Sequence, residues 1–529
     1  MTLKKGDYLA PFWAKPTTYY RGRDPMGLQN SSAVMYSRLL SGMTNVTSRI
    51  RYYGFFCWVF REYQALGLRE NTNPEVQKVF IRRCELLLSY IHTIIAPDIT
   101  GAIGSTYTGN KTKEEPPYPL AEGARLYGKD GHTDVYFQNS WGGFGLVYSG
   151  TLQFLGLVSK AEEFDIFLLT PEGEALAEAF AKNIPQEGQR LFLEVANKKN
   201  INREEVEQLH PFLLTHIPEG TEEWQFYIRL LTEVEEEFKA QNPYALSVLR
   251  SEVARQYLFF AGSVEKEGYL PAQFLLHNYL HKGFRQDDSI DPVSYGWYYY
   301  QLNDWLHYCL EVFLWGLLSG LNEEDPPRPI RAYFKAITEE VLAKLNDITG
   351  KAFTGEEPFA DLGLIPEETH LCQGELEKCS KNPLEHEAMA RALIQLVKLY
   401  RENEEEIPFL EKIALHLGAF EQNGNVLQVF GEYVLKNLER PLAEAIENIL
   451  FQIVNGHTQV AYRKLVSSGK NVIKLIVEEG RIQRVGWESP SYTSPRLGIL
   501  TGFLQDLQLL GPKNELTERG EQQLKKLTT

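Results

Sequence analysis

Apolar residues recur at helical spacing along most of the chain. Between residues 77 and 96 they fall at intervals of three and four, which predicts an amphipathic helix. Similar patterns predict helices in further stretches, namely 32–66, 183–321, 330–348, 384–405 and about 440–466. The sequence therefore predicts a mainly α-helical protein.

The most apolar stretch, Trp305–Leu321, has two interpretations, a membrane span or a buried helix. Glu311 lies inside it, and Asp304 and His307 lie at one end. The longest run without a charge is too short to cross about 30 Å of hydrocarbon. We therefore expect a helix that is buried on all sides within a protein core.

One pattern occurs twice in the chain. The matching pairs are Gly150–Val158 with Gly502–Leu510, and Leu169–Glu174 with Leu516–Glu521. Each copy predicts a helix, two short strands and a second helix, which is capped by the hydroxyl of Thr170 or Thr517. The segment between the two matching blocks is five residues shorter in the second copy.

This order of elements resembles the second half of a winged-helix module. The recognition helices would be Tyr148–Leu155 and Pro495–Leu507, and the wings would span residues 157–169 and 509–516. The resemblance implies DNA binding or docking to a protein. Base readout needs polar or basic side chains on the recognition helix, but the first helix has no Lys or Arg and the second has only Arg496. Both uses therefore remain open.

These patterns predict a multidomain helical protein with two winged-helix-like (α+β) modules. The Asn322–Pro329 segment is the clearest linker, and the Gly- and Pro-rich loop of residues 97–134 is long enough to suggest a functional role. The expected domains are an N-terminal helical region ending in the first module, an acidic helical domain, a second helical region, and a hairpin with the second module, at residues 1–182, 183–325, 326–470 and 471–529.

The charge is −16, which argues against a protein that coats nucleic acid with its whole surface. Two stretches are nevertheless basic: residues 1–65 have nine Lys or Arg against three acids, and residues 463–496 have seven against three. Any DNA contact is expected there, from Arg21, Arg23, Arg49, Arg51, Lys474, Arg481, Arg484 and Arg496. In a hairpin over residues 472–485, Lys474 and Arg484 would be near cross-strand neighbours. The alternative is that these cations pair with the protein's own acids.

The chain has one His/Cys cluster, formed by His370, Cys372, Cys379 and His386. Zinc binds such side chains in four-coordinate sites, so a structural zinc is one interpretation. The irregular spacing, without a Cys-x-x-Cys pair, supports the alternative that the four residues are unrelated. No other cofactor is expected, and no catalytic motif stands out in the sequence.

The segment from Pro25 to Tyr53 is similar to the N-termini of uncharacterised proteins from bacterial phage-defence gene clusters. We therefore expect a non-enzymatic subunit of a bacterial antiviral-defence or genome-maintenance complex that engages DNA and a partner protein. The alternatives are a kleisin-like bridging subunit of an SMC-type ATPase and a nuclease or other hydrolase. No signal peptide or membrane span is recognisable, which predicts a cytoplasmic protein.

Overall fold

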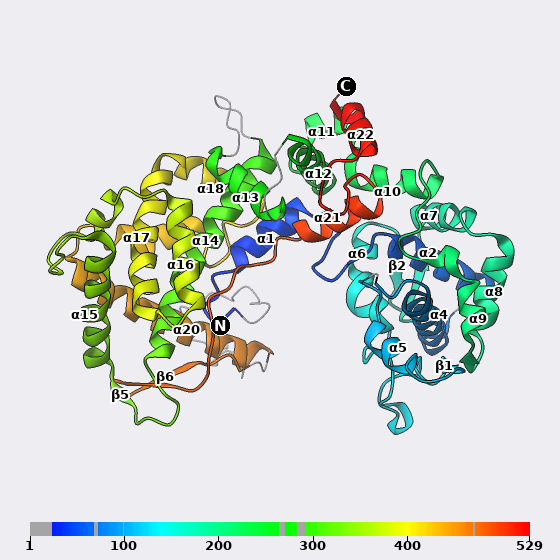
Figure 1. Cartoon of the computed structure of the whole chain (residues 1–529), viewed down its shortest axis with the longest axis horizontal. Helices are drawn as coiled ribbons and strands as arrows, with labels where there is room; N and C mark the ends of the chain where they lie inside the picture. Colours follow the sequence, from blue (N-terminus) through cyan, green and yellow to red (C-terminus); the bar gives the residue numbers. More distant parts are fainter. Residues whose placement is uncertain are drawn as a thin grey trace, which may run out of the picture. The chain divides into compact units, whose positions relative to one another are not determined.

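The computed structural model describes residues 24–67, 72–98, 100–263, 270–282, 291–468 and 471–528. It is mainly helical, as the apolar spacing predicts, and its strands are two to four residues long (Figure 1). Within these ranges, no helix combines the length and apolar character that a membrane span requires.

The chain forms two compact units, and each is assembled from separate segments. Unit 1 consists of Leu275–Thr493 with the described residues up to Arg38, and unit 2 consists of Leu39–Phe274 with the segment from Ser494 onward. The expected division into four consecutive domains does not coincide with these units. Linker composition indicates local breaks in the chain, whereas the units depend on packing between distant segments.

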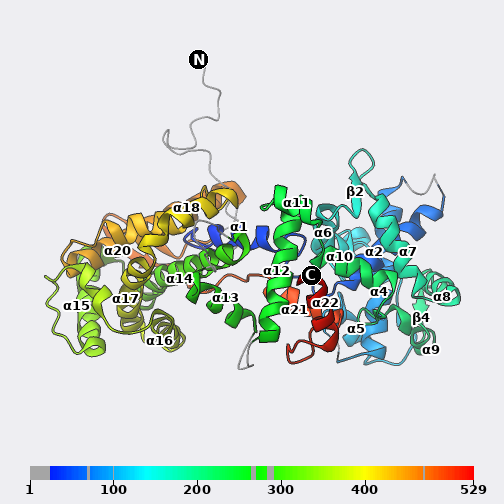
Figure 2. The ribbon, with the colours of Figure 1, turned by 90° about the horizontal axis from the view of Figure 1, so that it is seen from above.

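Unit 1 is built around one long buried helix, α14 (Pro292–Ser319). Asp291 caps its first turn, and its residues are buried from Val293 to Leu318, as predicted for a helix enclosed on all sides. It packs against α17, α18 and α20 (Figure 2). The other elements are α1 (Asn30–Leu39), β5 (Arg328–Pro329), α15 (Ile330–Thr349), α16 (Thr369–Lys381), α17 (Glu385–Asn403), α18 (Ile407–His416), α19 (Val426–Val429), α20 (Leu442–Ser468), β6 (Leu475–Glu478) and β7 (Arg481–Arg484).

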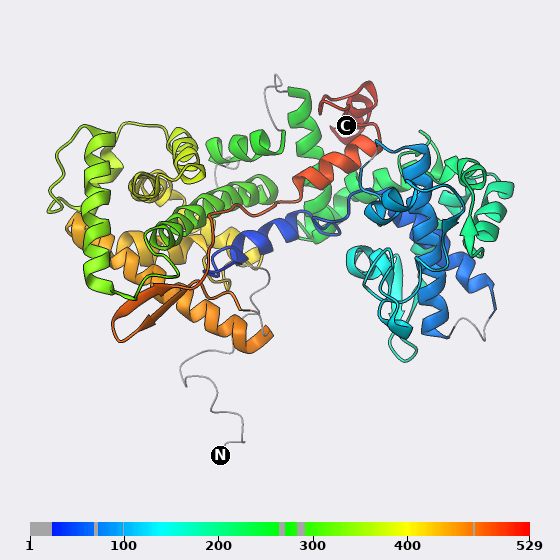
Figure 3. The same ribbon diagram turned by 60° about the horizontal axis from the view of Figure 1, so that its bottom comes forward.

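Three polar residues on α14 hold an extended segment that runs along the helix (Figure 3). Asp304 accepts hydrogen bonds from Thr493, 2.7 Å from its hydroxyl and 3.4 Å from its N–H. Glu311 accepts the N–H of Ser491 at 2.9 Å, and the Nε2 atom of His307 lies 3.2 Å from the Ser491 carbonyl oxygen. The polar residues of this apolar helix therefore fix residues 491–493.

Strands β6 and β7 form the predicted hairpin. They pair in antiparallel register from Leu475 opposite Arg484 to Glu478 opposite Arg481. The turn residues Glu479 and Gly480 both have positive φ, as a tight two-residue turn requires. Strand β5 adds to the other edge of β7.

Unit 2 has an aromatic core around α2 (Arg51–Ala65), which packs against α7 (Pro171–Lys182). The other elements are α4 (Pro74–Ile95), α5 (Ser105–Lys111), β1 (Tyr118–Pro119), α6 (Ser149–Phe154), β2 (Val158–Ala161), β3 (Ile166–Leu169), α8 (Gln186–Ala196), β4 (Asn200–Ile201), α9 (Arg203–Glu207), α10 (Glu222–Thr232), α11 (Glu236–Gln241), α12 (Leu246–Ser263), α21 (Leu497–Asp506) and α22 (Glu518–Thr528). Helix α13 (Leu270–Leu280) crosses the boundary between the units.

Both copies of the sequence repeat lie in unit 2, and they close with the same hydrogen bonds. The Thr170 hydroxyl accepts the Gly173 N–H at 3.1 Å and lies 2.5 Å from the Gly156 carbonyl oxygen and 3.2 Å from that of Leu157. The Thr517 hydroxyl accepts the Gly520 N–H at 3.0 Å and lies 2.6 Å from the Gln508 carbonyl oxygen and 3.1 Å from that of Leu509. The hairpin is complete in the first copy, as β2 and β3, and is reduced to one bridge between Leu510 and Leu516 in the second.

The first prediction concerns the glycines that close the repeat. A Cβ atom would lie 2.0 Å from the Leu157 carbonyl oxygen at Gly173, and 2.3 Å from that of Leu509 at Gly520. Because backbone atoms cannot yield easily, Gly173→Ala and Gly520→Ala should each lower the free energy of unfolding by about 1–3 kcal/mol. Thermal melting and urea titration measure this.

Gly150→Ala is the matched control for this prediction. A Cβ atom at Gly150, in α6, would meet no atom within 4 Å. This variant should unfold at the wild-type temperature or slightly above it. Equal stability of all three variants would show that close contact at the two carbonyls does not constrain the repeat.

The second prediction concerns the carboxyl of Asp304. Burial raises its pKa from 3.8 to about 7, and burial lowers the pKa of the neighbouring His307 to about 3. The folded state thus binds the proton of Asp304 more tightly than the unfolded chain does. The contribution of Asp304 to the free energy of unfolding should therefore fall as the pH rises between these two values and level off above them, whereas the lowered pKa of His307 contributes a rise with pH between about 3 and 6.5.

Asp304→Asn keeps an oxygen acceptor for Thr493 but removes the titration, so the falling contribution should be absent and the free energy of unfolding should decrease less, or increase more, with pH than in the wild type. Urea unfolding at a series of pH values measures the effect. Some slope should remain, because burial also raises the pKa of Glu85 to about 7 and that of Asp506 to about 6. The exposed Asp347 provides the control Asp347→Asn. An unchanged slope in Asp304→Asn would contradict the assignment.

Candidate nucleic-acid interface

The structure places the predicted basic residues in several different environments. Arg49 donates from Nη1 to the buried Asp506 at 2.5 Å and from Nε to the Thr100 carbonyl. Arg51 is fully buried, and its Nε lies 3.0 Å from Oε1 of Glu223. Arg51 therefore has no surface that a nucleic acid could contact, and the structure favours the predicted alternative, an internal ion pair, at this position.

The hairpin does not bring Lys474 and Arg484 together on one face. Residues directly opposite each other share a face of a two-stranded sheet, and successive residues alternate. Arg484 lies opposite Leu475, whereas the Lys474 carbonyl accepts the Val485 N–H, so Lys474 and Arg484 occupy opposite faces. Nζ of Lys474 lies 3.1 Å from a carboxylate oxygen of Glu488. Arg481 is exposed and lies on the same face of the hairpin as Lys474.

Two further arginines complete this set. Arg484 donates to the Leu318 carbonyl at 3.1 Å, and Arg496 donates to the Leu40 carbonyl at 3.4 Å. Arg21 and Arg23 lie outside the described residues. The described members of the set therefore have separate partners, within unit 1 for Lys474, Arg481 and Arg484 and within unit 2 for Arg49, Arg51 and Arg496.

The four candidate zinc ligands do not converge. His370, Cys372 and Cys379 lie on α16, and His386 lies on α17. Seven residues of helix separate the two cysteines by about 10 Å, too far for a shared ion with bonds of about 2.3 Å. In the part of the chain that the structure describes, no three His, Cys, Asp or Glu residues form a group that could hold a metal. The structure therefore favours the alternative interpretation, in which the four residues are unrelated, because the ligand types are present without the geometry.

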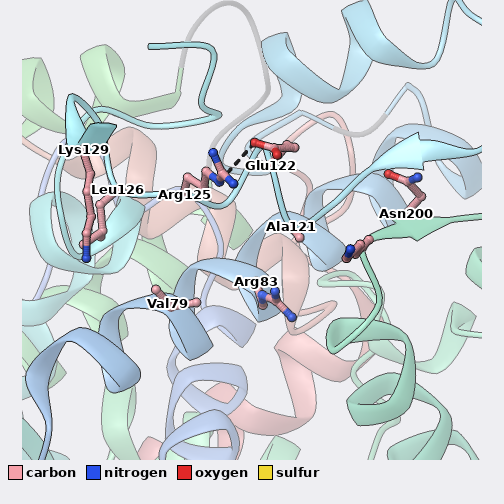
Figure 4. Close-up of a pocket in the computed structure, with 9 residues that line it drawn as sticks. Val79, Arg83, Ala121, Glu122, Arg125, Leu126, Lys129 and Asn200 are labelled. Carbon is pink, nitrogen blue, oxygen red and sulfur yellow. Dashed lines mark ion pairs between the residues drawn. The ribbon is translucent and has the colours of Figure 1, made fainter. Parts of the chain in front are cut away.

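Basic side chains instead gather around a cavity of about 630 Å³ in unit 2 (Figure 4). We call it the basic cavity. Its walls come from α4, from the loop of residues 121–129 and from the start of β4. Its lining residues are Val79, Arg83, Ala121, Glu122, Arg125, Leu126, Lys129, Lys199 and Asn200. Four of them are cationic and one is anionic, which contrasts with the acidic chain as a whole.

Of two adjacent arginines in α4, one is buried in the protein interior and the other lines the cavity. The helix begins after the cap Asn73, whose side chain accepts the N–H of Glu75, with Pro74 at its first position. Successive helical residues point about 100° apart, so Arg83 lines the cavity while Arg82 is fully buried behind it.

Arg82 fixes the loop that forms one wall. Its guanidinium donates to four loop carbonyls at 2.5–2.9 Å, those of Ala124, Arg125, Phe137 and Asn139. It also lies 4.8 Å from the ring centre of Tyr136. A buried arginine needs partners for its five N–H donors, and these carbonyls accept four of them.

A short sheet fixes the opposite wall. Strands β1 and β4 pair Tyr118 with Ile201, and the N–H groups of Leu120 and Ala121 both donate to the Lys199 carbonyl. The backbone of Lys199 is therefore anchored, while its side chain is exposed.

The cavity cations differ in how far they are neutralised. Arg125 pairs with Glu122 at 3.1 Å and Lys129 with Glu75 at 2.8 Å, both between largely exposed side chains. Exposed pairs contribute little to stability and can exchange partners. Among the described residues Lys199 has no ion pair.

Arg83 is anchored on one side only. Its Nη1 atom donates to the Asn197 carbonyl at 3.1 Å, and its Nε–H is buried without an acceptor. Its Nη2 atom makes no hydrogen bond with a described residue. The basic cavity thus offers positive charge and donors that the protein itself does not satisfy.

No family model, curated protein or solved structure matches this chain. The case for the basic cavity therefore rests on its own geometry.

Counting charges along the sequence missed this site, because its cations are spread from Arg83 to Lys199 and come together only in the fold. One signal pointed toward it. The Gly- and Pro-rich loop of residues 97–134 is unusually long in the sequence, and it supplies the cavity wall that includes Arg125 and Lys129.

The third prediction concerns Arg82. Arg82→Met removes the donors for four buried carbonyls and should lower the free energy of unfolding by about 3 kcal/mol or more. The loop should also open first, so trypsin should cut after Arg125 and Lys129 faster than in the wild type. Hydrogen exchange of the loop measures the same opening.

Arg203→Met is the control, since Arg203 forms an exposed pair with Glu207 within α9. It should leave both the stability and the cleavage rate close to those of the wild type. Wild-type protection of the loop in Arg82→Met would show that other contacts hold it in place.

Proposed function

We propose that this chain is a non-enzymatic, DNA-engaging subunit of a bacterial antiviral-defence or genome-maintenance complex, and that it contacts DNA phosphates through the basic cavity. The observation that carries the proposal is the gathering of Arg83, Arg125, Lys129 and Lys199 around one hollow of an acidic protein. The defence or maintenance role follows from the resemblance of the N-terminal segment.

The surrounding acidic charge supports contact at one place. A protein of net charge −16 repels a polyanion over most of its surface, so local cations decide where a nucleic acid can approach. Arginine and lysine side chains on phosphates are the usual source of such affinity, and they read no sequence by themselves. The proposed binding is therefore without base specificity.

The first repeat copy supports engagement of a partner protein. If the winged-helix resemblance holds, α6 occupies the place of the recognition helix, where a DNA reader needs polar or basic groups. This helix has no Lys or Arg, and exposed apolar side chains lie around it: Leu146, just before α6, is 67% exposed, Phe154 at its end is 50% exposed, and Phe164 is exposed in the hairpin turn. Apolar side chains at this position suit docking to a protein.

The second copy differs because its helix is enclosed. Thr501 of α21 lies 2.8 Å from the hydroxyl of Tyr257, Phe503 packs edge-on against Tyr53, and the Leu507 carbonyl accepts the indole N–H of Trp224. Both copies also belong to unit 2. This arrangement does not favour a kleisin-like bridge, which would hold partners with modules at separate ends.

The fourth prediction tests DNA binding. Lys199→Gln and Lys129→Gln should each weaken binding of a short duplex or single strand, without regard to sequence. Each should reduce the slope of log affinity against log salt by about one, because one phosphate contact is lost. Fluorescence anisotropy between low and moderate salt measures both quantities.

Lys335→Gln is the matched control, since Lys335 is an exposed lysine of α15 in unit 1. It removes the same charge away from the cavity and should leave the salt slope unchanged. An equal loss in all three variants would indicate a general charge effect. Wild-type affinity in the two cavity variants would contradict the proposal.

A further inference from the structure

We propose that the basic cavity binds the terminal phosphate monoester of a nucleotide, in preference to phosphodiesters inside a strand. This inference rests on the proposed function and names the part of the nucleic acid that the cavity takes. The shared chemistry is a phosphate monoester attached to a nucleoside, either at a strand end or in a free nucleotide.

The shape of the cavity is the first reason. Its walls come from three separate segments, α4, the loop of residues 121–129 and the start of β4, so the hollow is bounded on several sides (Figure 4). An internal phosphodiester must have chain leaving in two directions, whereas a terminal nucleotide needs only one opening. A volume of about 630 Å³ falls in the usual range for small-ligand pockets.

The charge of the cavity is the second reason. Four cations and one anion line it. A phosphate monoester bears about −1.5 to −2 charges at pH 7 and has three terminal oxygens, while a diester bears one charge. The more highly charged group gains more from a site with surplus positive charge.

The unsatisfied donors are the third reason. Lys199 has no ion pair among the described residues, and Nη2 of Arg83 makes no hydrogen bond with them. Nη1 of Arg83 is held by the Asn197 carbonyl, so its guanidinium is already positioned. Arg125 forms its exposed pair with Glu122 within the cavity, and an entering phosphate can take the place of that carboxylate.

The experiment compares single strands of about 12 nucleotides that share one sequence. One has a 5′-phosphate, one has a 3′-phosphate and one has hydroxyl groups at both ends. We expect one phosphorylated strand, or both, to bind about tenfold more tightly than the hydroxyl strand, because a charge-assisted hydrogen bond is added. A nucleoside monophosphate should compete with the phosphorylated strand more effectively than the nucleoside does.

The variants are Arg83→Gln and Lys199→Ser, and both should remove the preference for a terminal phosphate. Lys199→Ser decides the outcome if Arg83→Gln lowers the melting temperature, because the Lys199 side chain forms no ion pair that stabilises the described structure. Lys198→Ser is the matched control. Its side chain pairs with Glu205 at 2.6 Å and does not line the cavity, so the preference should persist.

The outcomes separate this inference from the proposed function. If the wild-type protein binds all three strands with equal affinity, and this affinity falls with salt, the terminal-phosphate assignment is overturned and DNA binding stays in place. A preference that survives in Lys199→Ser and in Arg83→Gln would also overturn it. No binding of any strand would overturn both the inference and the proposed function.

Discussion

The buried guanidinium of Arg82 connects the core of unit 2 with the surface that we propose to be functional. It satisfies four carbonyls of the loop of residues 124–139 and is itself satisfied by them. One turn later on α4, Glu85 accepts the hydroxyl of Tyr136 at 2.9 Å and the N–H of Gly143 at 3.1 Å. The loop that bears Arg125 and Lys129 therefore depends on buried groups of one helix, and the cavity depends on the loop.

The same chemistry distinguishes structural cations from cations that remain available. Arg51 and Arg82 have acceptors on all sides and no exposed surface, so their charges stabilise the fold. Lys199 is exposed and has no ion pair among the described residues. An excess of basic residues in a stretch of sequence does not separate these two situations, since burial and pairing depend on distant segments.

The parts of the fold that could be predicted are those that depend on neighbouring residues. The repeat closures follow from Thr170 and Thr517 with a glycine three residues later, and the hairpin follows from its Glu479–Gly480 turn. The division into units could not be predicted, because the described residues up to Arg38 join Leu275–Thr493 through contacts between segments that are distant in the sequence. The cavity escaped prediction for the same reason, since α4 and β4 are separated by more than a hundred residues of sequence.

The two repeat copies close with the same hydrogen bonds but lie in different surroundings. Each closure involves a threonine, a glycine three residues later, one leucine carbonyl and the carbonyl of the residue before that leucine. It therefore forms regardless of what covers the preceding helix. In the second copy the helix α21 is enclosed by Tyr53, Trp224 and Tyr257 and contributes to the core of unit 2. In the first copy, Phe154 stays exposed at the end of α6. Local hydrogen bonding thus determines the shape of the repeat, whereas its distant neighbours determine whether its surface is free to bind.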